Sequence, residues 1–273
     1  MTEKITSAQN PKIKQLLALQ EKSRLRRETG LFIVEGRREL QHCIEAGFQI
    51  DTIFFCEELG GSGAESAAAG FAATAAKIFE ISGEVYRKVA YREGTEGVVA
   101  EVRAKERKLE DLKLKEEPLI VVLESVEKPG NLGAVLRSAD AAGADAVIVC
   151  DPLTDLFNPN LIRASIGAVF TVPCVACSSE EAIRWLKAND VQILTAQLQD
   201  SEWYYDTDMK RGSAIVIGTE ATGLTQAWRD AADAHVKIPM LGAMDSLNAS
   251  VSAAILLFEA VRQRNGGRRD DIV

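Results

Sequence analysis

Residues 118–150 read PLIVVLESVEKPGNLGAVLRSADAAGADAVIVC. Two apolar runs, 118–124 and 144–150, flank a segment of helical length. Within that segment, apolar side chains recur at intervals of three and four, namely Leu132, Val135, Leu136 and Ala139. Short Val/Ile/Leu runs separated by helices are typical of parallel strands covered on both faces. This stretch therefore predicts an α/β fold with a parallel sheet.

Short apolar runs separated by segments of helical length continue downstream. VQILTA (191–196) and SAIVIG (213–218) are further apolar runs separated by helix-length segments. We therefore expect 118–265 to form one doubly wound domain. Ligands of such sheets bind beyond the carboxyl ends of the strands. The loops that follow the apolar runs are therefore the first places to look for a site.

Upstream, residues 1–102 predict a small α/β domain of alternating short helices and strands. Gly47 is expected to end a helix that starts at Arg37, and Ser82 to cap the next one. The alanine-rich run 64–76 is expected to be helical. The charged run 103–117 predicts a solvated linker, and 266–273 a short tail.

Length and composition set the broad class. At 273 residues the chain favours two domains, and its five cysteines, odd in number and scattered in apolar runs, predict buried free thiols. The first residues lack a secretory apolar core and no run is long enough for a membrane helix, so we expect a cytoplasmic protein. The net charge of −8 argues against a general nucleic-acid binder. Residues 10–38, however, carry eight Lys or Arg against three acids, which predicts a local basic face.

Three loops carry polar residues suited to a site. Asn131 and Arg137 follow the first strand, although a helix-entry turn with a surface arginine fits equally well. Glu220 lies in a G-x-E-x-x-G pattern, which disfavours a dinucleotide and also suits a capping glutamate. In the last loop Ser246 is expected to cap a long helix, with Asn248 on its first turn. That helix is expected to bury Leu247, Val251, Ala254, Ile255 and Phe258.

Taken together, the three loops resemble the signature motifs of the SpoU (TrmH-like) RNA ribose 2′-O-methyltransferase family of the SPOUT superfamily. The matching segments are 129–145, 217–224 and IPMLGAMDSLNASVSAAI at 238–255, and 158–173 is also typical. The departures, Thr219 and Ala249, stand where other small residues are frequent. The N-terminal part, with QNPKIK and FIVEGRRELQ, is similar to the RNA-recognition domain of many members.

This resemblance implies an enzyme that uses S-adenosylmethionine to methylate a ribose 2′-hydroxyl of structured RNA. The 23S rRNA is favoured as substrate and tRNA comes second. The resemblance also implies a C-terminal trefoil knot, an obligate homodimer with two composite sites, and no metal.

The resemblance further implies roles for single residues. The catalytic set is Arg137, Asn131, Glu220, Ser246 and Asn248. The cofactor-binding set is Ala196, Gln197, Gly218, Ile238, Met240 and Leu247. We expect RNA to be bound by Lys12, Lys14, Arg24, Arg26, Arg27, Arg37 and Arg163. A guanidinium is a poor base, so we expect Arg137 to grip a phosphate and stabilise the forming alkoxide.

Two other classes of function remain open from the sequence. A nicotinamide-dependent oxidoreductase would share the parallel sheet but lacks its G-x-G-x-x-G fingerprint here. A catalytically silent RNA-binding protein would keep the fold without needing the whole polar set. Cys174 and Cys177 are interpreted as core thiols in preference to a redox or zinc pair, and Trp203, Tyr204 and Tyr205 as packing residues.

Overall fold

The computed structural model describes residues 4–60, 70–71, 75–91 and 96–266. They fall into two units, and each is described by itself. The first unit comprises Met1–Lys105 together with Asp155–Thr171. The second comprises Glu106–Thr154 and Val172–Val273. Asp155–Thr171 thus packs with the N-terminal residues although it lies inside the range 118–265.

The second unit is built on a seven-stranded sheet in the order β10-β12-β9-β11-β6-β7-β8, in which every neighbouring pair is parallel. Its strands are β6 (Leu119–Glu124), β7 (Ala146–Cys150), β8 (Cys174–Cys177), β9 (Gln192–Ala196), β10 (Glu202–Trp203), β11 (Ser213–Ile217) and β12 (Ala234–Lys237). Val121 of β6 lies between Ile215 of β11 and Val147 of β7. The predicted parallel sheet is confirmed.

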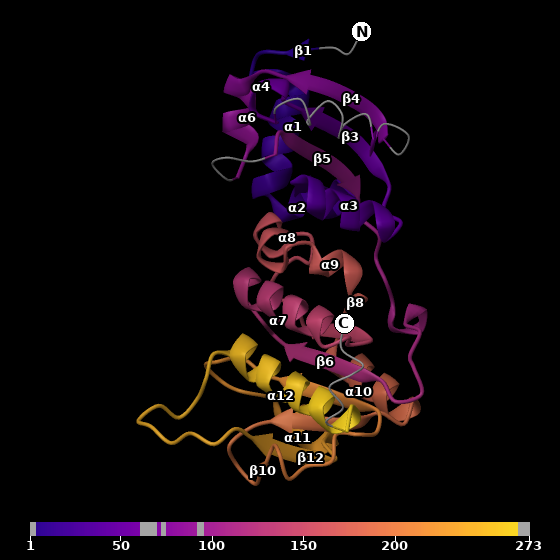
Figure 1. Ribbon diagram of the computed structural model, residues 1–273, viewed down its shortest axis with the longest axis vertical. Helices are drawn as coiled ribbons and strands as arrows, with labels where there is room; N and C mark the ends of the chain where they lie inside the picture. The colour runs from indigo at the N-terminus through magenta and orange to yellow at the C-terminus, as the bar shows by residue number, and fades with distance from the viewer. Residues whose placement is uncertain (1–3, 61–69, 72–74, 92–95, 267–273) are drawn as a thin grey trace. The chain divides into compact units, whose positions relative to one another are not determined.

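Helices cover both faces of this sheet. Helices α7 (Pro129–Ala141) and α12 (Ala249–Arg264) lie side by side against one face (Figure 1). Helices α10 (Ser179–Ala188) and α11 (Gln226–Ala231) pack on the other. The stripe predicted for α7 is fully buried, which confirms the helical period read from the sequence.

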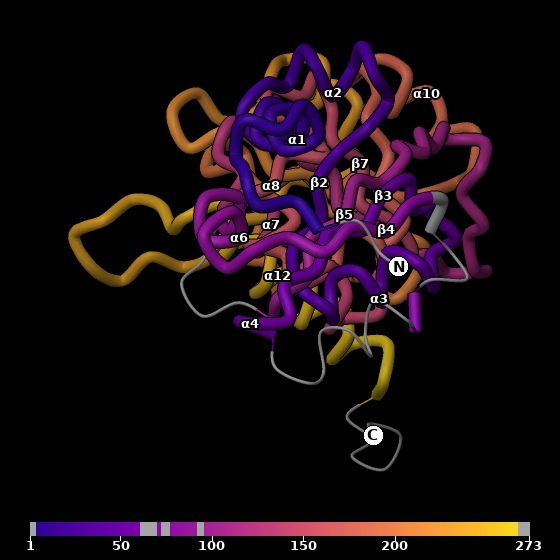
Figure 2. The backbone as a smooth tube through the Cα atoms, turned by 90° about the horizontal axis from the view of Figure 1, so that it is seen from above, coloured from indigo at the N-terminus to yellow at the C-terminus, as the bar shows by residue number. Residues whose placement is uncertain are grey.

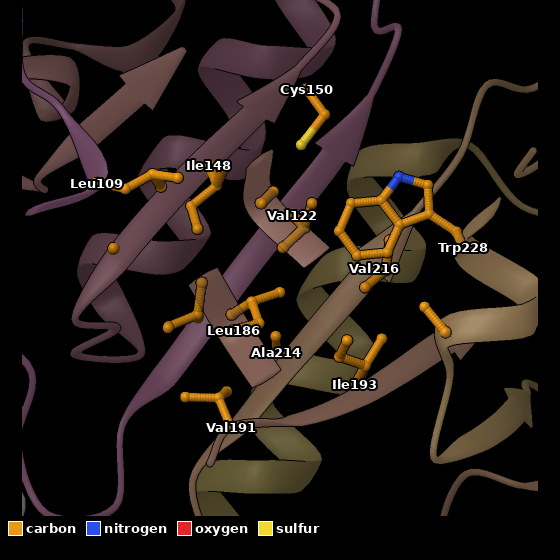
Figure 3. Packing of buried hydrophobic residues seen from close by; sticks show 14 of the residues in the cluster. Leu109, Val122, Ile148, Cys150, Leu186, Val191, Ile193, Ala214, Val216 and Trp228 are labelled. Carbon is orange, nitrogen blue, oxygen red and sulfur yellow. The ribbon is translucent and has the colours of Figure 1, made fainter. Parts of the chain in front are cut away.

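The core under α10 and α11 is apolar and closely packed (Figure 3). Trp228 is fully buried against strand residues such as Val122 and Val216, and its indole N–H donates to Ser179 Oγ over 2.9 Å. Leu109, in the short 3-10 helix η1 (Leu109–Asp111), joins the same core. The prediction of a fully solvated linker is therefore wrong at this leucine. All five cysteines are free, and only Cys177 is not fully buried, in line with the expectation of core thiols.

The first unit holds a five-stranded mixed sheet in the order β1-β4-β3-β5-β2. Its strands are β1 (Lys4–Ile5), β2 (Leu31–Glu35), β3 (Ile50–Phe55), β4 (Ala75–Ile81) and β5 (Val98–Arg103). Strand β4 is parallel to both neighbours, whereas β5 is antiparallel to β3 and β2. Most of the helix predicted at 64–76 falls outside the described residues, and β4 already begins at Ala75.

The helices of the first unit follow local capping signals. Asn10 caps α1 by accepting from Lys12 N over 2.9 Å, and Ser82 caps α6 as predicted. Gly47 follows the end of α3 with a positive φ of 76°, which suits glycine. The helices are α1 (Pro11–Glu21), α2 (Ser23–Thr29), α3 (Arg37–Glu45), α4 (Glu57–Gly60), α6 (Gly83–Val89), α8 (Pro159–Ser165) and α9 (Ala168–Thr171).

An aromatic cluster ties Asp155–Thr171 into the first unit. The rings of Phe32 and Phe157 stack with their centroids 4.4 Å apart, and Phe170 lies 5.3 Å from Phe48. Aromatic pairs of this kind add to the stabilisation given by burial alone. Helices α8 and α9 therefore complete this core.

Candidate functional site

Three of the predicted catalytic side chains meet in the second unit. Asn248 Nδ2 donates to Glu220 Oε1 over 2.6 Å, and Asn131 Nδ2 donates to the same oxygen over 3.2 Å. Asn248 Nδ2 also lies 3.2 Å from Asn131 Oδ1. The three residues come from α7, from the loop after β11 and from the start of α12. Segments far apart in the sequence thus build one polar cluster.

Asn248 occupies its place because it caps α12. Its side-chain oxygen accepts from Ser250 N over 3.0 Å, which satisfies a backbone donor of the first turn. The prediction that Ser246 is the cap is therefore wrong. Ser246 lies in the exposed loop ahead of the helix, where its hydroxyl donates to Asp245 over 3.2 Å.

Glu220 is the acceptor at the centre of the cluster. Lys128 Nζ lies 3.0 Å from Glu220 Oε2. The hydrogen bond and charge of Lys128, with smaller help from the Ala249 N–H and Asn131, lower the pKa of Glu220. The carboxylate is therefore ionised at neutral pH and can only accept hydrogen bonds. The sequence reading missed Lys128, although it precedes Pro129 in the first signature motif.

Gly218 and Gly223 form a tight backbone turn beside this cluster. A Cβ at Gly218 would lie 2.3 Å from the carbonyl carbon of Gly223, closer than any side chain can approach. Thr219 and Gly223 exchange backbone hydrogen bonds of 3.2 and 3.0 Å across the turn. Only glycine fits at position 218, so main chain and not side chain is presented there.

The remaining predicted cofactor residues lie in the loops after β9 and β12. Ala196 ends β9, and Gln197 N donates to Val236 O over 3.0 Å. Gln197 Oε1 is buried and has no hydrogen-bond partner among the described residues. The main chain of the three others likewise bonds to no described residue; they are Ile238, Met240 and Leu247. These unused polar groups are free to bind a ligand.

Arg137 is not part of the polar cluster. Its side chain is exposed on α7 and makes no hydrogen bond or ion pair with another residue in the described part of the chain. The structure therefore brings Asn131 but not Arg137 to Glu220.

The loop 238–248 extends away from the rest of its unit (Figures 1 and 2). Leu241 and Met244 within it are 98% and 71% exposed. Val251 and Phe258 on α12 are 45% and 48% exposed, and Leu247, just ahead of the helix, is 36% exposed, so the prediction that these three are buried is wrong within a single chain. The helix instead buries a second stripe, which comprises Ala253, Leu256, Leu257 and Ala260.

The predicted RNA-binding residues of the first unit do not all face outward. Arg26 is 5% exposed, donates to Leu19 O over 2.6 Å and pairs with Asp155 at 2.6 Å. Its prediction as an RNA ligand is therefore wrong, because its guanidinium holds the core together.

The other basic residues keep more exposure. Arg37 is half-buried and donates to two backbone carbonyls, while Lys12 lies 4.6 Å from the ring centroid of Phe79. Arg163, on α8, lies 4.6 Å over the ring of Tyr91. The fully exposed members of the predicted set are Lys14, Arg24 and Arg27.

Within the described ranges, no group of three or more His, Cys, Asp or Glu side chains is placed to hold a metal ion. None of the helices described here is both long and apolar enough to cross a membrane.

Both the N-terminal and the C-terminal part of the chain match known protein families. The SpoU rRNA Methylase family matches residues 118–258, and the MRM3-like substrate binding domain matches residues 10–100. A 23S rRNA (uridine(2479)-2′-O)-methyltransferase from Streptomyces viridochromogenes is 32% identical over 97% of this chain and 94% of its own length. A 23S rRNA (guanosine(2553)-2′-O)-methyltransferase from Bacillus subtilis is 28% identical over 93% of this chain and 97% of its own.

A solved structure agrees with these relatives. The AdoMet-bound rRNA methyltransferase from Sinorhizobium meliloti superimposes with a TM-score of 0.88 at 32% identity. The match covers 96% of this chain and 98% of that one. The likeness thus extends over both units and is not confined to the sheet that carries the polar cluster.

Proposed function

This chain belongs to the SpoU rRNA methylase family, and from that premise we propose how its residues share the work of methylating ribosomal RNA. The reaction is S-adenosylmethionine-dependent methylation of a ribose 2′-hydroxyl. The relatives named for 23S rRNA favour that RNA as the substrate. Family membership replaces both the oxidoreductase and the catalytically silent alternatives.

We place the methyl donor beside the turn at Gly218. The observation that supports this position is the set of unused polar groups there, the buried Gln197 Oε1 and the free main chain at Ile238 and Leu247. Polar main-chain loops fit a donor with an amino-acid end and a nucleoside end. Ala196 and Met240 would complete the walls. When bound, S-adenosylmethionine supplies an electrophilic methyl group on a sulfonium.

On the acceptor side, the cluster of Asn131, Glu220 and Asn248 would orient the ribose. This cluster is the observation that carries the proposal, because it gathers residues from three loops at one point. Methyl transfer from a sulfonium to a hydroxyl is an in-line displacement, and holding donor and acceptor in line accounts for much of its acceleration by an enzyme. Ser246, in the adjoining exposed loop, would close over the ribose once RNA is bound.

Arg137 would act at the developing charge. Its exposure and lack of partners in one chain suit a group that serves the site of a second copy. There it would grip a phosphate with its planar fork and stabilise the alkoxide that forms as the 2′-hydroxyl loses its proton.

A homodimer follows from the same reasoning. Val251 and Phe258 of α12 and the loop residues Leu241 and Met244 are large apolar side chains that a single chain leaves exposed. We propose that a second copy covers them, and that the segment after β12 forms the trefoil knot that the sequence resemblance implies. A cytoplasmic location remains a prediction.

The N-terminal range 1–102 is proposed to bind RNA through its exposed basic residues, joined by 103–117 to a catalytic range 118–265 that ends in the tail 266–273. The whole assignment is tested by incubating the purified chain with labelled S-adenosylmethionine and unmethylated 23S rRNA. Mapping of 2′-O-methyl sites should show one new modified nucleotide. Methyl transfer to a base, or no transfer although the donor binds, would overturn it.

A further inference from the structure

A cavity of about 160 Å³ lies in the first unit, between the end of β2 and α8. For comparison, an apolar protein cavity of about 150 Å³ holds a benzene molecule. Ile33 and Ile162 line part of the cavity, and charged groups surround them. The space therefore suits a small planar ring with a polar edge.

One wall of the cavity is flat. Arg163 lies 4.6 Å over the ring of Tyr91, and both residues line the cavity. Tyr91 is 46% exposed, so its ring is accessible from solvent. Unstacked RNA bases are commonly held on aromatic rings and on guanidinium planes. The Tyr91–Arg163 pair offers both surfaces together.

Two further lining residues, Glu39 and Glu96, carry hydrogen-bond acceptors. A Cβ at Gly36 would lie 2.6 Å from Glu39 Oε2 and 3.9 Å from Glu96 Oε2, so two carboxylates converge over this glycine. Glu96 Oε2 accepts from Arg37 N over 2.5 Å, and Glu39 Oε1 accepts from Arg38 Nη2 over 3.1 Å. Gly36 has φ +100°, which disfavours any larger residue there. Glu39 Oε2 and Glu96 Oε1 accept no hydrogen bond from the described residues, and both glutamates line the cavity, so each can still accept from a ligand there.

Carboxylates select ligands by the donors that those ligands present. An ionised carboxylate only accepts hydrogen bonds, so it repels an edge made of carbonyl oxygens. Guanine presents its N1–H and its 2-amino group side by side on the Watson–Crick edge, which matches two carboxylate oxygens. Uracil places a carbonyl on each side of its single N–H. We propose that this cavity takes one unstacked guanine of the RNA substrate.

This inference rests on the proposed function, because it names what part of the rRNA the first unit reads. Arg38, with 55% of its side chain exposed, lies at the cavity and can meet the phosphate of the bound nucleotide. The cavity would thus contribute sequence selectivity in addition to the affinity given by exposed basic residues.

The test is fluorescence anisotropy of the full chain with short oligouridylates that carry one central guanine, adenine, inosine or no substitution. The guanine probe should bind about tenfold more tightly than the adenine and all-uridine probes, with inosine between them. Tyr91→Ala should weaken the guanine probe about tenfold, the scale of a lost base stack. Glu39→Gln should abolish the preference for guanine. Glu84→Gln, an exposed carboxylate of α6, is the matched control and should change nothing.

A second measurement is independent of the folding of the Glu39 variant. A probe with 6-thioguanosine at the central position, irradiated on the wild-type chain, should cross-link to the peptide that holds Tyr91 or Arg163. Equal affinity for all four probes, or cross-links elsewhere only, overturns the inference. The proposed function is judged separately, by donor calorimetry and by methylation of unmethylated 23S rRNA. Active wild type with no guanine preference refutes only the cavity assignment, whereas no donor binding refutes the function.

Discussion

Asn248 joins two tasks in one side chain, because its amide nitrogen donates to Glu220 over 2.6 Å while its oxygen caps α12. The N-terminus of the helix and the polar cluster of Asn131, Glu220 and Asn248 are thereby held in a fixed relative position. A substitution of Glu220 should therefore displace the side chains of the cluster and lower the rate of methyl transfer, while the stability of the fold changes little.

We expect Glu220→Gln to lower methyl transfer by on the order of tenfold to a hundredfold. An amide carries no charge, and its NH2 group cannot accept from Lys128, so the cluster loses the ion pair that fixes the acceptor of Asn131 and Asn248. The melting temperature should stay close to that of the wild type, since the cluster is exposed. Steady-state kinetics and thermal melts measure the two effects. Glu180→Gln is the control, because 82% of the Glu180 side chain is exposed. Full activity of Glu220→Gln would show that Glu220 is not part of the site.

Arg137→Ala should cost several kcal/mol in the transition state, the scale seen when one oxyanion donor is removed. Donor affinity, measured by calorimetry, should barely change. Arg137→Lys should recover little activity because a point charge cannot replace a planar fork. Weaker donor binding in Arg137→Ala would contradict the assigned role.

The composite arrangement is tested by pairing two impaired variants in one dimer. If Arg137 serves the partner's cluster, an Arg137→Ala subunit paired with a Glu220→Gln subunit contains one intact site. Activity should then return to about half of the wild-type level by this count of sites. Mixed dimers that form but stay inactive would place Arg137 in its own subunit's site.

Arg26→Ala should lower the free energy of unfolding and should not remove a direct contact with RNA. The substitution leaves Asp155 without its cation in a largely buried position, with an expected cost of about 3 kcal/mol in the free energy of unfolding. Chemical denaturation followed by circular dichroism measures this cost. The neighbouring Arg27→Ala is the matched control, because Arg27 is exposed and should lose only RNA affinity. Comparable stability of the two variants would show that the Arg26 pair contributes nothing.

Stability should fall as the pH rises toward neutrality because of Glu101. Burial, reinforced by Asp51 and opposed by Lys77, raises the pKa of Glu101 from 4.5 to about 7. The folded state thus favours the protonated form. The favourable contribution is complete below about pH 4.5 and is lost as the pH passes 7.

Glu101→Gln mimics the protonated form and should be more stable than the wild type at pH 8 by on the order of 2 kcal/mol. At pH 5 the two should differ little. Thermal melts across this range measure the effect, and the exposed Glu28→Gln should follow the wild-type curve. Parallel curves for wild type and Glu101→Gln would show that Glu101 does not titrate in this range.

The sheet and the buried stripe of α7 could be predicted because their patterns are local and one-sided. The face of α12 could not. Its stripe with Val251 and Phe258 and its stripe with Leu256 and Leu257 are equally apolar, so periodicity alone cannot choose the one that the chain buries.

The start of α12 was also ambiguous, since Ser246 and Asn248 are both good capping residues. The burial of Arg26 depends on Asp155, which is 129 positions away, and no local pattern reveals such a partner. Asn131, Glu220 and Asn248 were singled out because they follow the predicted strands, but their catalytic role came only from the resemblance of the three loops to a known family.

The packing of Asp155–Thr171 with the N-terminal strands has a consequence for biosynthesis. Ribosomes deliver the chain from its N-terminus, and N-terminal domains usually fold first. Here the rings of Phe32 and Phe48 cannot pack against Phe157 and Phe170 until those residues are synthesised, after the first strands of the next unit. Until then the nascent N-terminal segment exposes an apolar surface, which makes this interval of translation the one in which a chaperone would be needed.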